Sequence, residues 1–207
     1  MRIWIINQFA NTPEMPGHTR QFEIASGLNK LGWKVSVFAS DFNLSMRKFT
    51  KLKTHQLSLT ENIEGIDWNW LRVTPYKQNN WLRYINFVSF CIHLFIQLII
   101  KEIVNIYTHK NTDFILVSSP QLPAAFTTLI FTKLFKKRFI IEIRDLWPQT
   151  LIEIGRHNPN SILIKSLAWM EKKIYSSAHL TIILSKGVES YVRKRGAKSV
   201  YFLPNGA

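Results

Sequence analysis

The stretch Phe139–Gln149, FIIEIRDLWPQ, combines a buried strand with a dense group of charges. Its first residues are large and apolar, as in a strand covered on both faces, and Glu142, Arg144 and Asp145 follow directly. Strands of this kind are typical of parallel sheets, which bind ligands beyond the carboxyl ends of their strands. The stretch therefore predicts a parallel sheet with a polar site at the end of this strand.

The order of the three charges predicts where they lie. Because side chains alternate along a strand, we expect Glu142 and Arg144 on one side, with Asp145 in the loop above them. A carboxylate there can hold sugar hydroxyls, a guanidinium can hold an oxyanion, and Trp147 can supply an apolar wall. A structural ion pair with a helix cap would use the same residues, and the local sequence leaves both interpretations open.

Apolar runs and helical patterns alternate along the rest of the chain. We expect strands near residues 2–7, 33–40, 65–75, 113–120, 138–144, 179–185 and 199–206, and helices near 19–32, 82–107, 122–135, 161–175 and 186–195. Loops are expected at Met46–Lys53 and Pro75–Trp81. This alternation predicts an α/β protein with a Rossmann-like, doubly wound and mostly parallel sheet. With 207 residues, of which 46% are hydrophobic, the chain is long enough for one large domain.

The chain is strongly basic, with 27 Lys and Arg against 13 Asp and Glu and a net charge of +14. Such a surface favours anionic partners such as phosphates, anionic lipid or nucleic acid, although solubility alone would also explain it. Cys91 is the single cysteine, so no internal disulfide forms, and its apolar surroundings predict a core position. The amino-terminal stretch MRIWIINQF has too short an apolar run for a signal peptide.

The loop after the first strand, Asn7–Arg20, carries candidate binding residues. It leads into a helix, and the free N–H groups and dipole at a helix amino terminus favour an anion. Gly17 would let the backbone approach a phosphate, and His18, Thr19 and Arg20 would add donors. Alternatively, this is an ordinary loop in which Thr19 serves as the N-cap.

Two other strand ends are polar as well. Ser118 and Ser119 end one expected strand and would either bind a ligand or cap the next helix. Asn205 lies in the turn Pro204–Gly206. The histidines show no metal-ligand spacing, and the chain has neither the glycine fingerprint of a dinucleotide site nor a G-x-S-x-G nucleophile motif. The basic runs match no nucleic-acid module.

Four stretches together resemble a known family: PGHTRQFEIASGLNKLGWKVSVFAS, TPYKQNNWLRYINFVSF, EIRDLWPQTLIEIG and LPNG, at residues 16–40, 74–90, 142–155 and 203–206. They are similar to the amino-terminal half of bacterial retaining glycosyltransferases of family 4. The subgroup they resemble includes the L-fucosamine transferase of O-antigen and capsule synthesis. RDLWPQ and the P-G-x-T-R loop are the most specific parts of this resemblance.

The resemblance implies a GT-B enzyme, in which two Rossmann-like domains enclose the site and no metal or other cofactor is needed. Residues 1–207 would then be the acceptor-side domain, without the donor-binding domain and inactive alone. A nucleotide-sugar would be the donor substrate. Gly17 would lie near its phosphates, and Arg144 and Asp145 would lie at the reacting sugar. There Asp145 would stabilise an oxocarbenium-like transition state, and the leaving phosphate would take the acceptor proton.

The segment Tyr84–Val104 raises the question of a membrane. Its polar residues follow at helical spacing, which predicts a polar stripe about 120° wide on an otherwise apolar helix; they are Asn86, Ser89, His93, Gln97 and Lys101. Three interpretations stay open: a core helix with its broad apolar face buried, a helix lying on the membrane, and a true span. If the acceptor is polyprenol-linked, this segment and the basic patches would hold the protein at the inner face of the plasma membrane, in the cytoplasm. Trp81, Arg83 and Lys77 suit that interface.

A function of another class also fits the composition. The chain would then be a non-catalytic basic module that binds anionic lipid or nucleic acid. The glycosyltransferase interpretation predicts no nucleic-acid partner, so the two differ in their ligands. A small nucleotide-binding protein complete in itself is a third interpretation, against which the missing glycine fingerprint counts.

Overall fold

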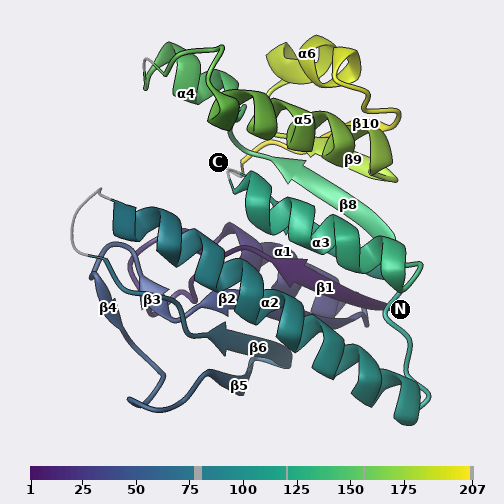
Figure 1. Ribbon diagram of the computed structural model, residues 1–207. Helices are drawn as coiled ribbons and strands as arrows, with labels where there is room; N and C mark the ends of the chain where they lie inside the picture. Colours follow the sequence, from purple (N-terminus) through teal and green to yellow (C-terminus); the bar gives the residue numbers. More distant parts are fainter. Residues whose placement is uncertain (77–80, 120, 156, 206–207) are drawn as a thin grey trace. The chain divides into compact units, whose positions relative to one another are not determined.

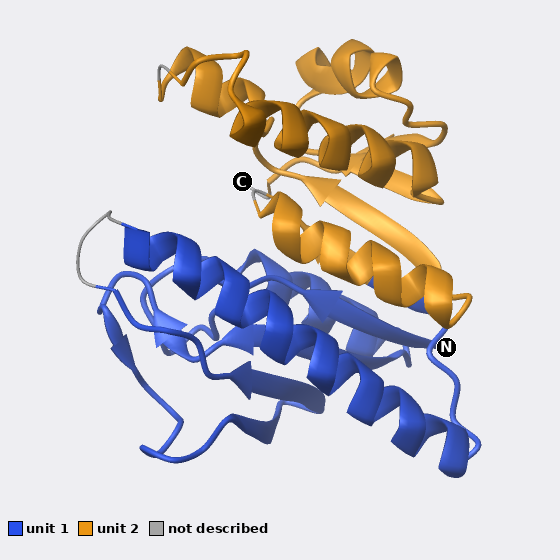
Figure 2. Cartoon of the chain, viewed as in Figure 1, with its two compact units in different colours: residues 1–115 blue, residues 116–207 orange. Residues whose placement is uncertain are grey.

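The structure is a computed structural model, and it describes residues 1–76, 81–119, 121–155 and 157–205 (Figure 1). The chain divides into two compact units, residues 1–115 and 116–207 (Figure 2), which are described one at a time. Both are α/β units with mostly parallel strands. The expected Rossmann-like fold class is therefore confirmed.

The first unit contains four strands in the order β1 (Arg2–Ile6), β2 (Lys34–Ser40), β6 (Ile66–Leu71) and β5 (Ser58–Ile63). The pairs β1–β2 and β2–β6 are parallel, as their buried apolar sequences predict. Strand β5 was not predicted. It pairs antiparallel with β6 through a two-residue hairpin at Glu64 and Gly65, which have φ angles of 51° and 82°. Positive φ at both positions is typical of a tight hairpin turn, where glycine costs little strain.

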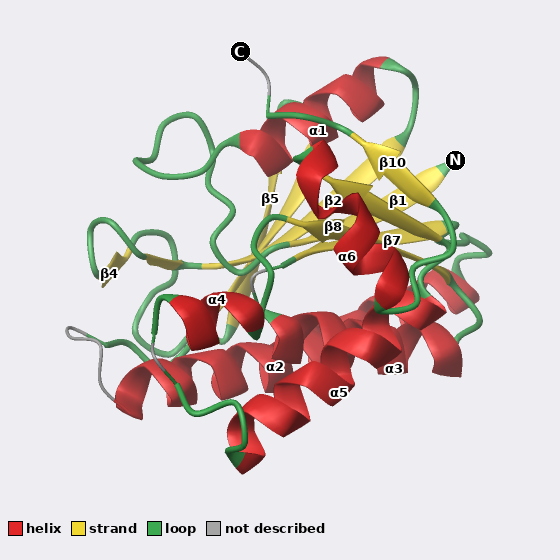
Figure 3. Ribbon diagram, turned by 90° about the horizontal axis from the view of Figure 1, so that it is seen from above, coloured by secondary structure: helices red, strands yellow, loops and turns green. Residues whose placement is uncertain are grey.

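Helices cover both faces of these strands. Helix α1 (Arg20–Lys30) buries Phe22 and Ala25, and the long helix α2 (Trp81–Tyr107) lies on the opposite face (Figure 3). A sheet covered on both faces is the doubly wound arrangement that the sequence predicts. The expected loop at Pro75–Trp81 lies partly outside the described residues, because 77–80 are not among them.

The second unit also combines parallel strands with helices. Strand β7 (Phe114–Ser118) crosses the boundary between the units, and β8 (Arg138–Ile143), β9 (Leu180–Ile183) and β10 (Val200–Phe202) pair in parallel. Helices α3 (Leu122–Leu134) and α5 (Ile162–Ser177) pack against each other on one face (Figure 3), and α6 (Glu189–Lys194) contacts α5 through a hydrogen bond between Tyr191 and Glu171. Two short elements were not expected as such: helix α4 (Gln149–Glu153), and the 3-10 turn η1 (Lys186–Val188), which replaces the start of the expected helix 186–195.

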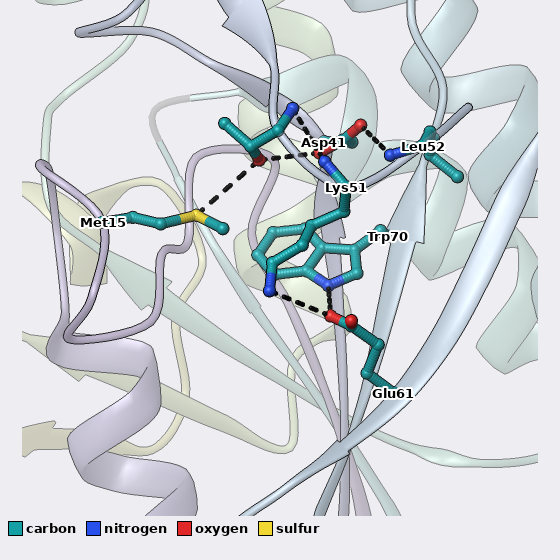
Figure 4. A network of polar contacts seen from close by, with 7 residues as sticks. Met15, Asp41, Lys51, Leu52, Glu61 and Trp70 are labelled. Atoms are coloured by element: carbon teal, nitrogen blue, oxygen red, sulfur yellow. Dashed lines mark hydrogen bonds and ion pairs between the residues drawn. The ribbon is translucent and has the colours of Figure 1, made fainter. Parts of the chain in front are cut away.

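The basic stretch Met46–Lys53 is not entirely a loop. Lys48–Phe49 forms strand β4, which pairs antiparallel with β3 (Phe42–Asn43). The physical reason is Asp41, a buried carboxylate at the end of β2. It accepts hydrogen bonds from the Thr50 amide and hydroxyl at 3.0 and 2.8 Å, and from the Lys51 and Leu52 amides at 2.7 Å each (Figure 4). Four donors offset the desolvation of this carboxylate and fold the segment back onto it.

The carboxylate of Glu61 makes further contacts to the same basic segment and to β6. It accepts a hydrogen bond of 2.8 Å from the indole of Trp70 and lies 3.5 Å from the ammonium of Lys51 (Figure 4). The unpredicted strand β5 is thus tied to both β6 and the basic segment. Neither the contact with Trp70 nor the contact with Lys51 can be predicted from a local pattern in the sequence.

Helix α2 corrects one interpretation of Tyr84–Val104. The sequence left open a core helix with its broad apolar face buried, but the structure buries only part of that face, at Phe87, Phe90, Leu94 and Leu98, and exposes the rest. The buried positions include Asn86, Glu102 and Asn105, whereas Ile92, Ile96 and other aliphatic residues are about half exposed. Cys91, expected in the core, is only half-buried on this helix.

Candidate functional site

Two strand ends of the second unit meet through Ser118 and Glu142. The Ser118 hydroxyl, at the last residue of β7, donates a hydrogen bond of 2.5 Å to the Glu142 carboxylate in β8. The Ser119 amide donates to the Glu142 carbonyl at 2.8 Å. Both side chains of the Ser118–Glu142 pair are buried. They therefore lie beneath the strand end and support it, and direct contact of either with a sugar stays a prediction.

The hydroxyl of Ser119 fixes the loop that follows β8. It accepts a hydrogen bond of 3.1 Å from the Arg144 amide and donates one of 3.4 Å to the Asp145 carbonyl. The Trp147 amide also donates to the Asp145 carbonyl, at 3.1 Å. The predicted residues from the two strand ends are thus brought together, and these hydrogen bonds fix the backbone of the loop.

The side chains of Arg144 and Asp145 are accessible to solvent. Arg144 is half-buried and Asp145 is exposed. Within the described part of the chain, neither the guanidinium nor the carboxylate makes a hydrogen bond or an ion pair. The alternative of a structural ion pair therefore finds no support in the structure. Trp147 is half-buried beside them.

In the first unit, the Gly17 loop is held mainly by asparagines. Gly17 has φ of 138°, and a Cβ placed there would lie 2.2 Å from Nδ2 of Asn11. The Asn43 amide donates to Oδ1 of Asn11 at 3.1 Å and to the Pro16 carbonyl at 3.0 Å. The close approach that requires glycine here is thus to Asn11. Contact of this loop with a phosphate stays a prediction.

The start of α1 differs from the expected capping. Thr19 occupies the N-cap position, but its side chain accepts no hydrogen bond from the first turn. Its hydroxyl instead donates to the Glu23 carboxylate at 2.8 Å. His18 is exposed and Arg20 is half-buried. Asn205, the predicted binding residue in the second unit, is exposed near the end of the described chain.

Two cavities accompany these elements. One of about 380 Å³ adjoins the Gly17 loop in the first unit, where Pro16 lines it together with Met15, Lys48 and Lys51. The other, of about 450 Å³, lies in the second unit at the amino end of β8, and Arg138 and Phe139 are among its lining residues. The second is at the opposite end of β8 from Arg144, so it does not belong to the strand-end site.

Among the described residues, no group of three His, Cys, Asp or Glu side chains is placed to hold a metal ion.

A buried acid on α5 was not predicted as a site. Glu171 is fully buried, lies 3.4 Å from the guanidinium of Arg195, and accepts a hydrogen bond of 3.2 Å from the Tyr191 hydroxyl. Burial raises the pKa of Glu171 to about 7, against the opposing effect of Arg195. Burial also raises the pKa of Tyr191 to about 12 and that of Tyr175, and Glu171 adds to both shifts. The sequence signal was present: Glu171 falls on the same helical face as Leu167 and Ile174.

Comparison with known proteins gives the fold a context. No protein-family model matches the chain, and no curated protein matches its sequence. Among solved structures, it is similar to sucrose-phosphate synthase from Thermosynechococcus elongatus, with a TM-score of 0.65, 13% identity, and coverage of 100% of this chain and 48% of that one. It is similar to the catalytic domain of starch synthase IV from Arabidopsis thaliana, bound to ADP and acarbose, with a TM-score of 0.59, 11% identity and coverage of 99% and 51%. A third similar structure is Alr3699/HepE from Anabaena, in complex with UDP and glucose, with a TM-score of 0.53, 11% identity and coverage of 100% and 45%.

These similarities show the fold. The chain has the Rossmann-like α/β fold of GT-B glycosyltransferases and spans about half the length of the three chains named. At identities of 11 to 13%, the resemblance does not extend to a subgroup or to a substrate. The strand-end residues must therefore carry any functional argument.

Proposed function

We propose that this chain is the acceptor-side domain of a retaining, family 4 glycosyltransferase. The enzyme would move a sugar from a nucleotide-sugar to a lipid-linked or polysaccharide acceptor in cell-surface polysaccharide synthesis, such as that of O-antigen or capsule. One observation carries the proposal: at the end of β8, on a loop fixed by Ser119, the charged groups of Arg144 and Asp145 have no partner in the part of the chain that the structure describes. Ligands of open α/β sheets bind beyond the carboxyl ends of strands, where these charges lie.

Each residue then has a distinct task. The Asp145 carboxylate binds a sugar hydroxyl and stabilises positive charge that develops on the sugar ring in the transition state. The Arg144 guanidinium holds an oxyanion, for which its fork of N–H donors is suited. Ser119, Ser118 and Glu142 position that loop. The leaving phosphate accepts the proton of the acceptor hydroxyl, so the chain needs no separate general base and no metal.

The donor is the second part of the proposal. Two of the similar structures contain a nucleoside diphosphate, ADP in one and UDP in the other. By analogy, the Gly17 loop and the amino terminus of α1 would add N–H donors toward the donor phosphates. Residues 1–207 are about half as long as the enzymes they resemble. We therefore place the main donor-binding residues in a second Rossmann-like domain outside these 207 residues.

The experiment compares this chain with the longest polypeptide whose reading frame contains it. Both are incubated with a panel of nucleotide-sugars and polyprenol diphosphate-linked sugars, and the transfer of radiolabelled sugar is measured. The longer polypeptide should transfer one sugar with retention of anomeric configuration, and the 207-residue chain should show no turnover. Turnover by the short chain, or a reading frame that adds no second domain, would refute the half-enzyme assignment. A longer polypeptide that transfers no sugar but binds nucleic acid would refute the glycosyltransferase assignment.

A further inference from the structure

The polar stripe of α2 faces its own unit and is hydrogen-bonded there. At the amino-terminal end of the helix, the Asn86 amide accepts from Gln8 at 2.6 Å and donates to the Thr74 carbonyl at 2.7 Å, and Ser89 accepts from the Thr74 amide at 2.9 Å. His93 contacts the Arg72 carbonyl. These partners lie in the first loop and in the segment that follows β6.

The rest of the stripe continues this pattern down the helix. Gln97 donates to the Ser58 hydroxyl at 2.9 Å, and Lys101 donates to the Thr60 hydroxyl at 3.4 Å, so both reach strand β5. Asn105 donates to the Thr112 hydroxyl at 3.0 Å. Burial also lowers the pKa of Lys101, opposed by the nearby charge of Asp67. The polar stripe of α2 therefore faces its own unit, beside the buried side chains of Phe90, Leu94 and Leu98.

The outer face of α2 is the opposite in character. Its exposed side chains are all apolar or aromatic, and most of them recur at intervals of three or four residues: Trp81, Tyr84, Ile85, Val88, Ile92, Ile96, Ile100, Ile103, Val104, Ile106 and Tyr107. The aromatic residues lie only at the two ends of this stripe, and isoleucine and valine fill the middle. We call this surface the outer stripe. It is far longer than the scattered apolar residues that an ordinary soluble surface shows.

We propose that the outer stripe inserts into one leaflet of an anionic phospholipid membrane, with α2 lying in the plane of the bilayer. The helix has 27 residues and is about 40 Å long, so the stripe would contact lipid along its full length. Isoleucine and valine would enter the acyl-chain boundary, and the tryptophan and tyrosines at its ends would lie among the headgroups. The net charge of +14 complements anionic headgroups.

The inward hydrogen bonds argue against a helix that crosses the membrane. By length and composition alone α2 qualifies for a span, with a mean hydropathy of 1.9 over 18 residues. A span would have to leave the unit and expose Asn86, Gln97 and Lys101 to lipid, away from their present partners. Polar groups in the hydrocarbon core are costly without partners. An in-plane helix keeps every one of these contacts and still buries the outer stripe.

The composition of the stripe argues for lipid over a second protein surface. Protein interfaces carry about one hydrogen bond per 100–200 Å² and a polar rim. Between Ile85 and Ile106, the exposed side chains of α2 include no hydrogen-bond donor or acceptor. Acyl chains need none. This inference does not rest on sugar transfer, since it uses no residue of the strand-end site.

The test is flotation of the 207-residue chain with vesicles. Vesicles contain phosphatidylcholine alone, or with 30% phosphatidylglycerol. The variant Ile92→Gln/Ile96→Gln/Ile100→Gln changes the middle of the outer stripe. The matched control, Leu31→Gln/Ile130→Gln/Leu134→Gln, changes three exposed apolar residues outside α2. Circular dichroism and thermal unfolding establish that both variants are folded.

Wild-type and control chains should float with anionic vesicles, remain bound in 1 M salt and be released by detergent, because apolar burial is not screened by salt. The α2 variant should partition at least about 100-fold more weakly. Failure of the wild type to float, equal flotation of the α2 variant, or release by salt alone would overturn the proposal. A second result would also overturn it. If the wild-type chain does not float, and sedimentation equilibrium shows a dimer that the α2 variant abolishes, then the outer stripe binds a second copy of the chain and not lipid.

Depth separates an in-plane helix from a span. In a Cys91→Ser background, a spin label at Ile96→Cys should lie about 5–10 Å below the headgroups, by its relative accessibility to oxygen and to a nickel chelate. A spanning helix would place this central residue near the mid-plane, at about 15 Å. A mid-plane depth would refute the in-plane arrangement.

Discussion

The fully buried carboxylate of Glu142 accepts a hydrogen bond of 2.5 Å from the hydroxyl of Ser118 on the neighbouring strand end. This pair explains why a core strand carries an acid at its carboxyl end. Glu142 lies inside the unit, and its partner and backbone fix Ser119, which in turn holds the loop of Arg144 and Asp145. The first charge of the opening stretch is buried and hydrogen-bonded, and the charged groups of the next two make no hydrogen bond or ion pair among the described residues.

Removing this hydrogen bond should destabilise the fold. In Ser118→Ala the buried carboxylate loses a donor, and we expect the free energy of unfolding to fall by about 1–3 kcal/mol. Urea denaturation followed by circular dichroism measures it. Ser166→Ala, at an exposed site on α5, should change it by less than about 0.5 kcal/mol. Equal stability of the two variants would show that the Ser118–Glu142 contact is not needed.

Arg144→Ala and Asp145→Asn should separate activity from stability. Their charged groups have no partner among the described residues, so the free energy of unfolding should change by less than about 0.5 kcal/mol. In the longer polypeptide, kcat/KM should fall roughly 10- to 1,000-fold for each variant, the range for loss of one charge-stabilising group. Lys194→Ala, exposed on α6, is the matched charge control. Full activity of Asp145→Asn would remove Asp145 from the catalytic site.

Gly17 and Gly27 should respond in opposite directions to alanine. At Gly17 a Cβ would meet Asn11 at 2.2 Å in a left-handed backbone region, so Gly17→Ala should lower the free energy of unfolding by roughly 1–3 kcal/mol. Gly27 lies within α1 with no atom within 4 Å of a built Cβ, so Gly27→Ala should raise it by about 0.5–1 kcal/mol. Thermal unfolding of both variants tests this contrast. A Gly17→Ala variant as stable as wild type would mean that the loop relaxes freely.

Glu171 should make stability depend on pH. Its pKa is about 7 in the folded chain against an ordinary value of 4.5, so between these pH values the folded state holds a proton that the unfolded state has lost. The stronger proton binding by folded Glu171 contributes roughly 1–3 kcal/mol to the free energy of unfolding. This contribution is fully present below about pH 4.5 and is lost as pH rises through 7.

The variant Glu171→Gln should flatten that dependence, since a neutral amide does not titrate. Urea denaturation at several pH values from 4.5 to 8 measures the slope. Glu153→Gln, an exposed change on α4, should keep the wild-type slope. An unchanged slope in Glu171→Gln would assign the titration to another group.

The fold class could be predicted because it depends on local patterns. The continuous apolar runs of β1, β2 and β8 and the helical periods of α1 and α3 are confirmed as elements. Strand β5 could not be predicted in this way. It is an edge strand of mixed polarity, and its pairing with β6 and the contact between Glu61 and Trp70 stabilise it. The small helix α4 likewise has no buried residue that would give a period.

For the strand-end site, sequence alone determined which residues follow β8 and that Asp145 begins a loop. Only the tertiary structure decided that Glu142 is buried and hydrogen-bonded to Ser118, while the charges of Arg144 and Asp145 find no partner among the residues described, because Ser118 lies on another strand. The same holds for α2. The sequence determined a polar stripe on an apolar helix, since spacing alone sets that angle. The structure decided that the polar stripe faces inward, because Thr74, Ser58 and Thr60 supply partners for it, and that only part of the apolar face is buried, which leaves the outer stripe at the surface.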